Sequence, residues 1–452
     1  MDTFLVQDRD LANQLERQIK GLADKLRDPE HVESTVINKV STYDIKEIAY
    51  YYGWSGTDLG NGFPGICCFL AELDKTFPNK GWDVVGHTYL VRMKEYMESD
   101  GFHSLSLWGG LTGICFATLA LSRNGIRYQN LLNQLHDILI QNLPAEIDRC
   151  MRQIPEGVEM PNYDVIGGLT GIGRYLLYHK DKPDMKRLLD GILRYLIALT
   201  EDKVVIGEKV PGWYIPSKHQ FLESEKVQYP NGNFNLGFAH GIPGCLALLS
   251  IAKIQGYEIE NQNKAISVIA NWLVAWSQED QFGPLWPRRV SLEEQVLKKT
   301  ESKATVYEAW CYGEIGIARS IWLAGTALQN EGWKELALDV FKGLHKRSNN
   351  NFTLISPTYC HGIAGSLHTV QLMLQEHPTE SLLMYRNFLL EKLVDHIDMN
   401  KPFGVTDNEV IQEKCYAFDK PGLLNGSAGI AMVLLSVIRE RGLEWDSVFL
   451  VR

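Results

Sequence analysis

A Gly-x-x-Gly element occurs seven times along this chain, and it constrains the fold more than any other feature of the sequence. The first glycines lie 48 to 73 residues apart, and each element precedes an apolar run that is compatible with a helix. The seven copies are Gly62–Gly65, Gly110–Gly113, Gly168–Gly171, Gly241–Gly244, Gly313–Gly316, Gly362–Gly365 and Gly426–Gly429. Such a repeat indicates one structural unit that is used seven times.

Segments with one apolar and one charged face alternate with these apolar runs. They lie near 11–26, 87–97, 131–143, 185–199, 264–276, 333–345 and 381–397. A helix that is apolar on most faces must be buried, whereas an amphipathic helix can cover it from outside. We therefore predict an all-α fold, an α/α toroid of seven inner and seven outer helices, with 1–452 as a single domain.

Two segments interrupt the helical pattern. Residues 203–235 combine β-branched and aromatic residues with Pro-Gly and Asn-Gly turns, which predicts a small β-containing insertion. Residues 284–303 form a second excursion, which we expect to be partly extended. The glycines that begin the inner helices are predicted to remove side chains at crowded helix ends and to allow tight turns. Helix N-termini favour negative charge, so we look for chemistry at this end.

The composition excludes several classes of protein. Lys and Arg total 45 against 55 Asp and Glu, and the net charge of −10 opposes non-specific binding to nucleic acid or anionic lipid. The N-terminus lacks the order of a signal peptide, and the longest apolar run, near 430–438, is shorter than the ~20 residues of a membrane span. Eight cysteines are too sparse for a disulfide scaffold. We expect a cytoplasmic protein without a transmembrane segment or a nucleic-acid partner.

Cysteine and histidine occupy matching positions just before three consecutive first glycines. These positions hold Ala239-His240, Cys311-Tyr312 and Cys360-His361. Zinc favours Cys thiolates and His nitrogens, and a catalytic zinc keeps three protein ligands and one open position. Cys311, Cys360 and His361 would supply that set for one Zn²⁺. His240 is then either a fourth ligand, which closes a structural site, or an acid/base group, and we favour the second because a catalytic metal needs its open position.

Asp164 lies four residues before Gly168. A carboxylate near the start of a helix is often only a cap for backbone N–H groups. Its alternative role is catalytic, and the position alone leaves both roles open.

Five motifs make the chain resemble a known family. NYDVIGGLTGIGRYL, NLGFAHGIPG, AWCYGEIGIA, YCHGIAGSLH and LLNGSAGIA are similar to motifs of the lantibiotic cyclases, the LanC family, of bacterial type. The resemblance extends from about Gly62 to Gly429, and WCYG and CHG are its most specific parts. It implies that Cys311, Cys360 and His361 are zinc ligands. It also implies that His240 is the active-site histidine, Asp164 its acidic partner and Tyr312 a residue that lines the site.

The resemblance also implies an activity and partners. LanC cyclases are zinc enzymes that add precursor-peptide Cys thiols to dehydroalanine or dehydrobutyrine by Michael addition, which forms the thioether rings of lantibiotics. The expected substrate is a dehydrated precursor peptide with its leader and core. A dehydratase and an ABC exporter are the expected partners in a membrane-associated complex, and the chain is then expected at the inner face of the membrane. The 203–235 insertion resembles the position of a small extra domain in such cyclases.

One departure and two alternatives remain open. In the family pattern an arginine precedes WCYG by about one helical turn, whereas this chain has Tyr307, and its nearest upstream arginines are Arg288 and Arg289. One alternative is a non-catalytic, zinc-containing protein of the LanC-like type that binds thiols or peptides. The other is an α/α-barrel glycoside hydrolase, which requires paired carboxylates where the matching positions hold Cys and His.

Overall fold

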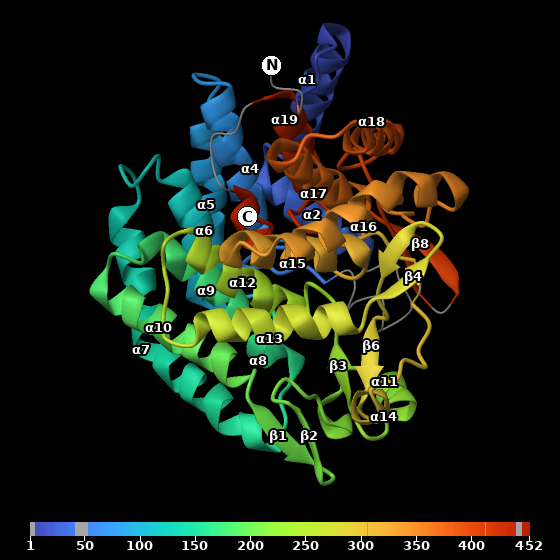
Figure 1. The fold of residues 1–452 in the computed structure, drawn as a ribbon. Helices are drawn as coiled ribbons and strands as arrows, with labels where there is room; N and C mark the ends of the chain where they lie inside the picture. The colour runs from blue at the N-terminus through green and yellow to red at the C-terminus, as the bar shows by residue number, and fades with distance from the viewer. Residues whose placement is uncertain (1–4, 41–52, 305, 412, 440–444) are drawn as a thin grey trace. The chain divides into compact units, whose positions relative to one another are not determined.

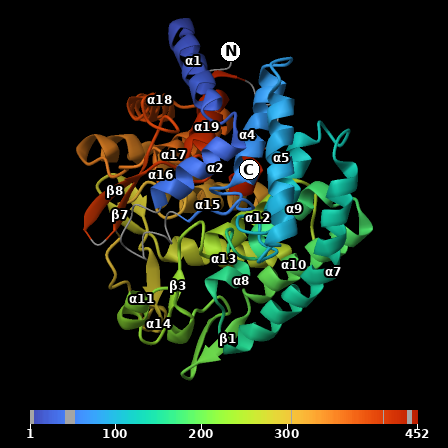
Figure 2. The same cartoon turned by 180° about the vertical axis from the view of Figure 1, so that it is seen from behind.

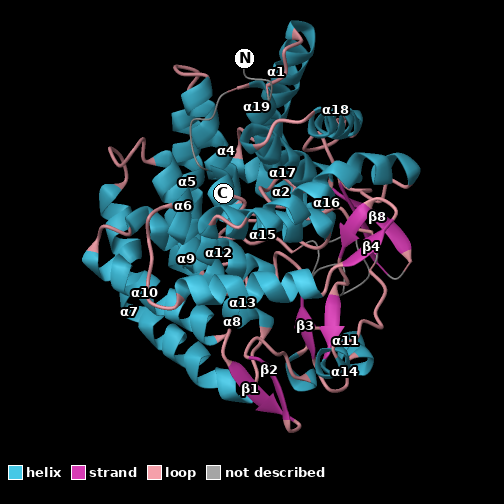
Figure 3. Cartoon of the chain, in the orientation of Figure 1, coloured by secondary structure: helices cyan, strands magenta, loops and turns pink. Residues whose placement is uncertain are grey.

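The computed structural model describes residues 5–40, 53–304, 306–411, 413–439 and 445–452 (Figure 1). Most of these residues lie in helices, and the strands are short (Figure 3). The chain divides into two compact units, the first formed by Met1–His136 and Leu354–Trp445 and the second by Asp137–Thr353 and Asp446–Arg452. The single domain over 1–452 stays a prediction.

The first unit contains four of the inner helices that follow a Gly-x-x-Gly element. They are α4 (Phe63–Thr76), α6 (Leu111–Leu121), α17 (Ile363–Glu376) and α19 (Ser427–Ile438). They pack in the order α17, α19, α4, α6. The amphipathic helices of this unit are α1 (Arg9–Asp24), α5 (Trp82–Ser99) and α18 (Glu380–Asp395), and α2 (Pro29–Val40) is an additional helix. Figure 2 shows α1 beside α19 and α4 beside α5, in agreement with their contacts.

The second unit contains the other three inner helices. They are α9 (Leu169–Leu176), α12 (Ile242–Ile254) and α15 (Glu314–Leu328), and they pack in that order. Their outer partners are α10 (Pro183–Ala198), α13 (Gln262–Ala275) and α16 (Glu331–Asn350). The long α7 (Gln129–Gln153) has its greater part in this unit. All seven predicted apolar helices and all seven predicted amphipathic helices are therefore present.

Burial explains why the two kinds of helix alternate. Every residue from Glu314 to Gly325 of α15 is buried, whereas α10 buries mainly the apolar side that carries Leu188, Leu189 and Ile192. The inner helices are covered all round and the outer helices are covered on one face, as their sequence patterns require. None of the helices in the described part of the chain is both long enough and apolar enough to cross a bilayer.

The first glycine of each element is the N-cap of its inner helix, and crowding explains its identity. A Cβ on Gly241 would lie 2.3 Å from the Asn235 carbonyl oxygen, and one on Gly362 would lie 2.2 Å from that of Ser356. Only Gly313, with φ 118°, adopts a backbone conformation that favours glycine; the other six are extended. The expectation of special turn angles is thus wrong for six of the seven, which need space instead.

Short strands carry the non-helical segments. The 203–235 segment contains the hairpin of β1 (Asp202–Val205) and β2 (Glu208–Pro211), then η3 (Ser217–His219), α11 (Glu223–Gln228) and β3 (Asn233–Asn235). The 284–303 segment contains most of β5 (Gly283–Leu285), which pairs with β4 (Gln278–Asp280), then β6 (Arg289–Ser291) and α14 (Leu292–Leu297). Strands β3 and β6 pair antiparallel, with Asn235 opposite Arg289. The 203–235 and 284–303 segments are thus joined by backbone hydrogen bonds.

Some elements fall outside the repeat. The hairpin of β7 (Asp407–Ile411) and β8 (Lys414–Phe418) belongs to the first unit, and the sequence patterns did not predict it. The short helices η1 (Ile154–Glu156) and α8 (Met160–Tyr163) precede Asp164, η2 (Leu177–His179) extends α9, and η4 (Trp445–Phe449) lies near the C-terminus.

Candidate active site

Backbone hydrogen bonds join the loops that lead into successive inner helices of the second unit. The N–H of Val165 donates to the carbonyl oxygen of Ala239 at 3.0 Å, and the N–H of Ala239 donates to that of Cys311 at 3.1 Å. Ala239 and Cys311 stand at the same position, two residues before a first glycine. This ladder explains why matching positions in the repeat lie side by side in space.

Asp164 and His240 meet through this ladder. Asp164 Oδ1 accepts hydrogen bonds from the N–H groups of Gly167 and Gly168 at 2.7 and 2.8 Å, while its Oδ2 lies 2.6 Å from His240 Nδ1. The Asp164 side chain is 2 % exposed, but that of His240 is 36 % exposed. The carboxylate is therefore both a cap and a partner, and only the imidazole can be reached from solvent.

The surroundings of His240 favour its charged form. Burial lowers the pKa of His240. The hydrogen bond to Asp164 and the negative charge of Asp164 raise this pKa by more, so the net shift is upward. Cys311 also raises this pKa, while the positive charge of Arg289 lowers it. With Nδ1 donating to Asp164, Nε2 is the nitrogen positioned to exchange a proton.

Tyr312 is held by two residues that the sequence motifs did not identify as site residues. Its hydroxyl oxygen accepts hydrogen bonds from Arg289 Nη2 and from Asn235 Nδ2, each at 3.0 Å. The Arg289 guanidinium also lies 5.1 Å from the centre of the Tyr312 ring, and Nη2 donates to Glu225 Oε1 at 2.8 Å. The ring of His240 lies 6.3 Å from that of Tyr312. The structure therefore brings Asp164, His240 and Tyr312 together.

The pairing of β3 with β6 places Arg289 here. Asn235 is opposite Arg289 in this pair, and both reach the same hydroxyl. Arg289 was too distant from WCYG in sequence to be assigned to the site, and nothing in the local pattern indicated the strand pairing. Arg288, its neighbour, lies instead over the ring of Tyr307, 4.9 Å from its centre.

The remaining two predicted zinc ligands belong to the first unit. The N–H of Cys360 donates to the carbonyl oxygen of Leu424 at 3.0 Å, and the N–H of Leu424 donates to that of Gly60 at 2.8 Å, so the same ladder operates here. His361 follows Cys360 directly and precedes α17.

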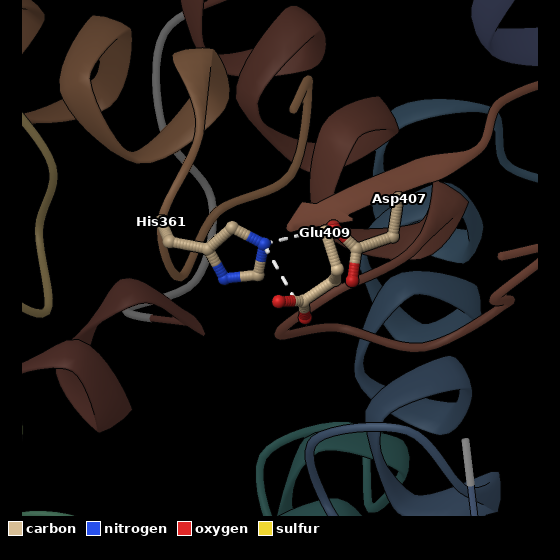
Figure 4. A group of neighbouring side chains, drawn as sticks. All are labelled: His361, Asp407 and Glu409. Atoms are coloured by element: carbon tan, nitrogen blue, oxygen red, sulfur yellow. Dashed lines mark hydrogen bonds and ion pairs between the residues drawn. The ribbon is translucent and has the colours of Figure 1, made fainter. Parts of the chain in front are cut away.

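A buried carboxylate lies beside His361. His361 Nε2 is 2.9 Å from Asp407 Oδ1 and 3.6 Å from Glu409 Oε1, and Figure 4 shows the imidazole edge directed at both carboxylates from β7. Lys420 Nζ donates to Asp407 Oδ2 at 2.8 Å. Burial raises the pKa of Asp407, but the charges of Lys420 and His361 outweigh it and hold this pKa well below its usual range.

The chemistry of these side chains fits zinc. The predicted ligands carry the donors that zinc prefers, sulfur on Cys311 and Cys360 and nitrogen on His361, and their meeting at one ion stays a prediction. A metal-bound histidine commonly donates its other N–H to a carboxylate, as the His361 to Asp407 contact allows. The ligand atoms of His361, Asp407 and Glu409 lie within 4.8 Å of one another and could themselves approach a cation. The Lys420 ammonium already balances these carboxylates, which favours them as partners of His361.

Comparison with known proteins identifies the family. A family model described as lanthionine synthetase C-like protein matches residues 53–450. The chain belongs to this family. This lanthionine synthetase C-like protein is 28% identical over 380 residues to the nisin biosynthesis protein NisC of Lactococcus lactis subsp. lactis, across 83% of this chain and 84% of that protein.

A solved structure gives the same result for the fold. The lanthionine synthetase C-like chain superposes on nisin cyclase with a TM-score of 0.75 and 25% sequence identity, over 93% of this chain and 97% of that one. The predicted fold class, an all-α α/α toroid with small β elements, is confirmed.

Proposed function

We propose that this protein is a zinc-dependent cyclase of lantibiotic biosynthesis. It adds Cys thiols of a dehydrated precursor peptide to dehydroalanine or dehydrobutyrine, which forms lanthionine or methyllanthionine rings. The observation that carries the proposal is the buried Asp164 bonded to the accessible His240, beside the loop of Cys311. Similarity to nisin cyclase across most of both chains supports it.

Cys311, Cys360 and His361 are the proposed ligands of one zinc ion. A bound zinc ion supplies thiolate activation, because coordination deprotonates a thiol whose pKa is otherwise about 8.5. Three such ligands would leave the ion open to the substrate thiol.

His240 is the proposed proton carrier. The addition forms one C–S bond at the β-carbon of the dehydrated residue, and the electron pair of the C=C bond moves to the α-carbon as an enolate. His240 Nε2 accepts the thiol proton and returns it to the α-carbon, so no proton is gained or lost overall. Asp164 accepts from Nδ1, holds the ring in place and stabilises the imidazolium that forms between the two transfers.

Tyr312 and Arg289 complete the wall of the proposed site. The Tyr312 hydroxyl is fixed by Arg289 and Asn235, so the ring keeps its place beside His240. We infer that Arg289 takes over the position of the arginine that the family pattern has one turn before Cys311, where this chain has Tyr307. Its guanidinium, which is paired with Glu225, keeps the Tyr312 hydroxyl in place.

The proposal includes the expected partners and location. The substrate is the dehydrated precursor with its leader and core. A dehydratase and an ABC exporter are the proposed partners in a membrane-associated complex, and the chain is proposed to work in the cytoplasm at the inner face of that membrane.

Ring closure tests the proposal directly. The protein with zinc is incubated with a dehydrated precursor, and the remaining peptide thiols are alkylated and counted by mass spectrometry. We expect alkylation to disappear as rings close, and to persist with Cys311→Ala or with a precursor that was never dehydrated. Persistent alkylation of every cysteine with the unmodified protein would contradict the proposal. It would favour the alternative, a zinc-containing protein that binds thiols without joining them.

A further inference from the structure

We propose that Asp407 is a positioning residue that fixes the tautomer and the orientation of His361, so that His361 binds zinc through Nδ1. The proposal rests on the zinc site of the proposed function. The Asp407 side chain is 0 % exposed and the His361 side chain is 17 % exposed, and Oδ1 of the first lies 2.9 Å from Nε2 of the second. A buried contact of this length is a hydrogen bond that solvent does not replace.

Asp407 is itself anchored at both carboxylate oxygens. Ser356 Oγ donates to Oδ1 at 2.7 Å, and Lys420 Nζ donates to Oδ2 at 2.8 Å. Thr358 Oγ1 lies 3.4 Å from Oδ1. Neighbouring hydroxyls and an ammonium keep the carboxylate ionised and stationary, which a group that orients another side chain needs.

The anchors belong to the segments that carry the two partners. Ser356 and Thr358 lie in the loop that ends at His361, Asp407 lies on β7, and Lys420 follows β8. The side chain of Asn408 also donates to the carbonyl oxygen of Ile355 at 2.8 Å. Hydrogen bonds therefore hold the hairpin of β7 and β8 against the loop that carries His361. We infer that this hairpin, which is not part of the helical repeat, serves to position His361.

The tautomer follows from the acceptor. A neutral imidazole carries one N–H, and an ionised carboxylate can only accept, so the hydrogen stays on Nε2 and the lone pair on Nδ1. The lone pair is what a metal ligand contributes, and a carboxylate on the opposite nitrogen increases its basicity. Glu409 is farther from Nε2, at 3.6 Å, and is a secondary partner.

Zinc affinity and the ring tautomer test the proposal independently of catalysis. Competition with a chromophoric chelator gives the zinc affinity of the wild type, Asp407→Asn, and Glu413→Gln, a control on the exposed turn of the same hairpin. We expect one zinc per chain, an affinity that falls about 10- to 100-fold in Asp407→Asn, and no change in the control. Nitrogen-15 spectra of histidine-labelled, metal-free protein should show the Nε2–H form of His361 in the wild type and a mixture in Asp407→Asn.

A double variant separates a direct loss of zinc affinity from a loss that is caused by misfolding. Asp407→Asn leaves the buried Lys420 ammonium without its nearest partner, so Asp407→Asn with Lys420→Met removes both charges, and we expect the same loss of affinity. Unchanged affinity and tautomer in both variants would overturn the role of Asp407 and leave the zinc site standing. A wild-type protein that binds no zinc would instead overturn the proposed function.

Discussion

Asp58 in the first unit and Asp164 in the second occupy the same place in the repeat, four residues before a first glycine. Among the described residues, a histidine lies beside Asp164 but not beside Asp58. Both cap the turn: Asp58 Oδ1 accepts from the N–H of Asn61 at 2.6 Å, as Asp164 Oδ1 accepts from Gly167 and Gly168. The residue before the next first glycine is His240 for Asp164 and Gly109 for Asp58. A Cβ on Gly109 would lie 3.7 Å from Asp58 Oδ2.

The two loops show how little separates a structural turn from a candidate catalytic pair. The backbone arrangement and the capping carboxylate are shared, and one side chain makes the difference. The presence or absence of this histidine also changes the charges that surround each aspartate. Burial raises the pKa of Asp58 to about 6, against the lowering effect of hydrogen bonds from the N–H groups of Asn61 and Gly60. Asp164, in contrast, has the imidazole of His240 at its Oδ2.

The largest expected effect comes from removing the side chain that distinguishes the two loops. We expect His240→Ala to slow ring closure by about 10²- to 10⁴-fold, because the proton carrier is lost. The rate is measured by thiol alkylation of the peptide over time. Elemental analysis should still find one zinc per chain, and loss of the metal would instead make His240 a ligand.

Changing the two aspartates to asparagine sharpens the comparison. Asp164→Asn removes the charge that stabilises the imidazolium of His240, and we expect ring closure to slow by about 10²-fold. Asp58→Asn, the matched change in the other loop, should leave the rate unchanged. Equal losses in both variants would show that these carboxylates act only through the turns that they cap.

The raised pKa of Asp58 predicts a pH dependence of stability. Between about pH 4 and 6 the unfolded chain has released this proton while the folded chain retains it, so the free energy of unfolding falls as the pH rises through this range. Asp58→Asn should remove this loss and raise the free energy of unfolding by about 1–2 kcal/mol at pH 8, with little change at pH 4, since the side chain is only half-buried. Urea unfolding from pH 4 to 8 measures the difference, and parallel curves for both proteins would contradict the assignment.

The smallest effect is expected from introducing a histidine beside Asp58. Gly109 is exposed and has room for a Cβ, so Gly109→His should place an imidazole near Asp58. The new positive charge should lower the pKa of Asp58 and flatten the pH dependence of stability, without changing ring closure. Titration of the new histidine by nuclear magnetic resonance gives its pKa, and an ordinary histidine pKa would show that the pair had not formed.

The helical repeat and part of the site could be predicted because both depend on local or periodic features. The Gly-x-x-Gly elements identify the inner helices, since a Cβ at these glycines would strike the preceding loop. Matching positions identified His240 and Cys311, and the backbone ladder between loops explains why position in the repeat became proximity in space. The sequence left two roles open for Asp164, and its carboxylate both caps the turn before α9 and contacts His240.

The contributions of Arg289 and Asp407 could not be predicted because each depends on a short strand. Arg289 reaches Tyr312 through the pairing of β6 with β3, and strands of three residues leave no periodic pattern. Asp407 lies 46 residues from His361, on a polar five-residue strand that reads as a loop. Their positions follow from tertiary packing, which overrides local preference.

The ladder of peptide groups has a consequence for how such a protein can change. Neighbouring loops of each unit hold one another through main-chain atoms, so the residue type next to each first glycine can vary while the scaffold persists. Insertions or deletions within these loops would displace the backbone groups that form these hydrogen bonds, whereas substitutions leave the backbone hydrogen bonds intact. Reactivity can therefore be gained, lost or moved to another repeat by single replacements, and Asp58 with Gly109 is a ready place for such a gain.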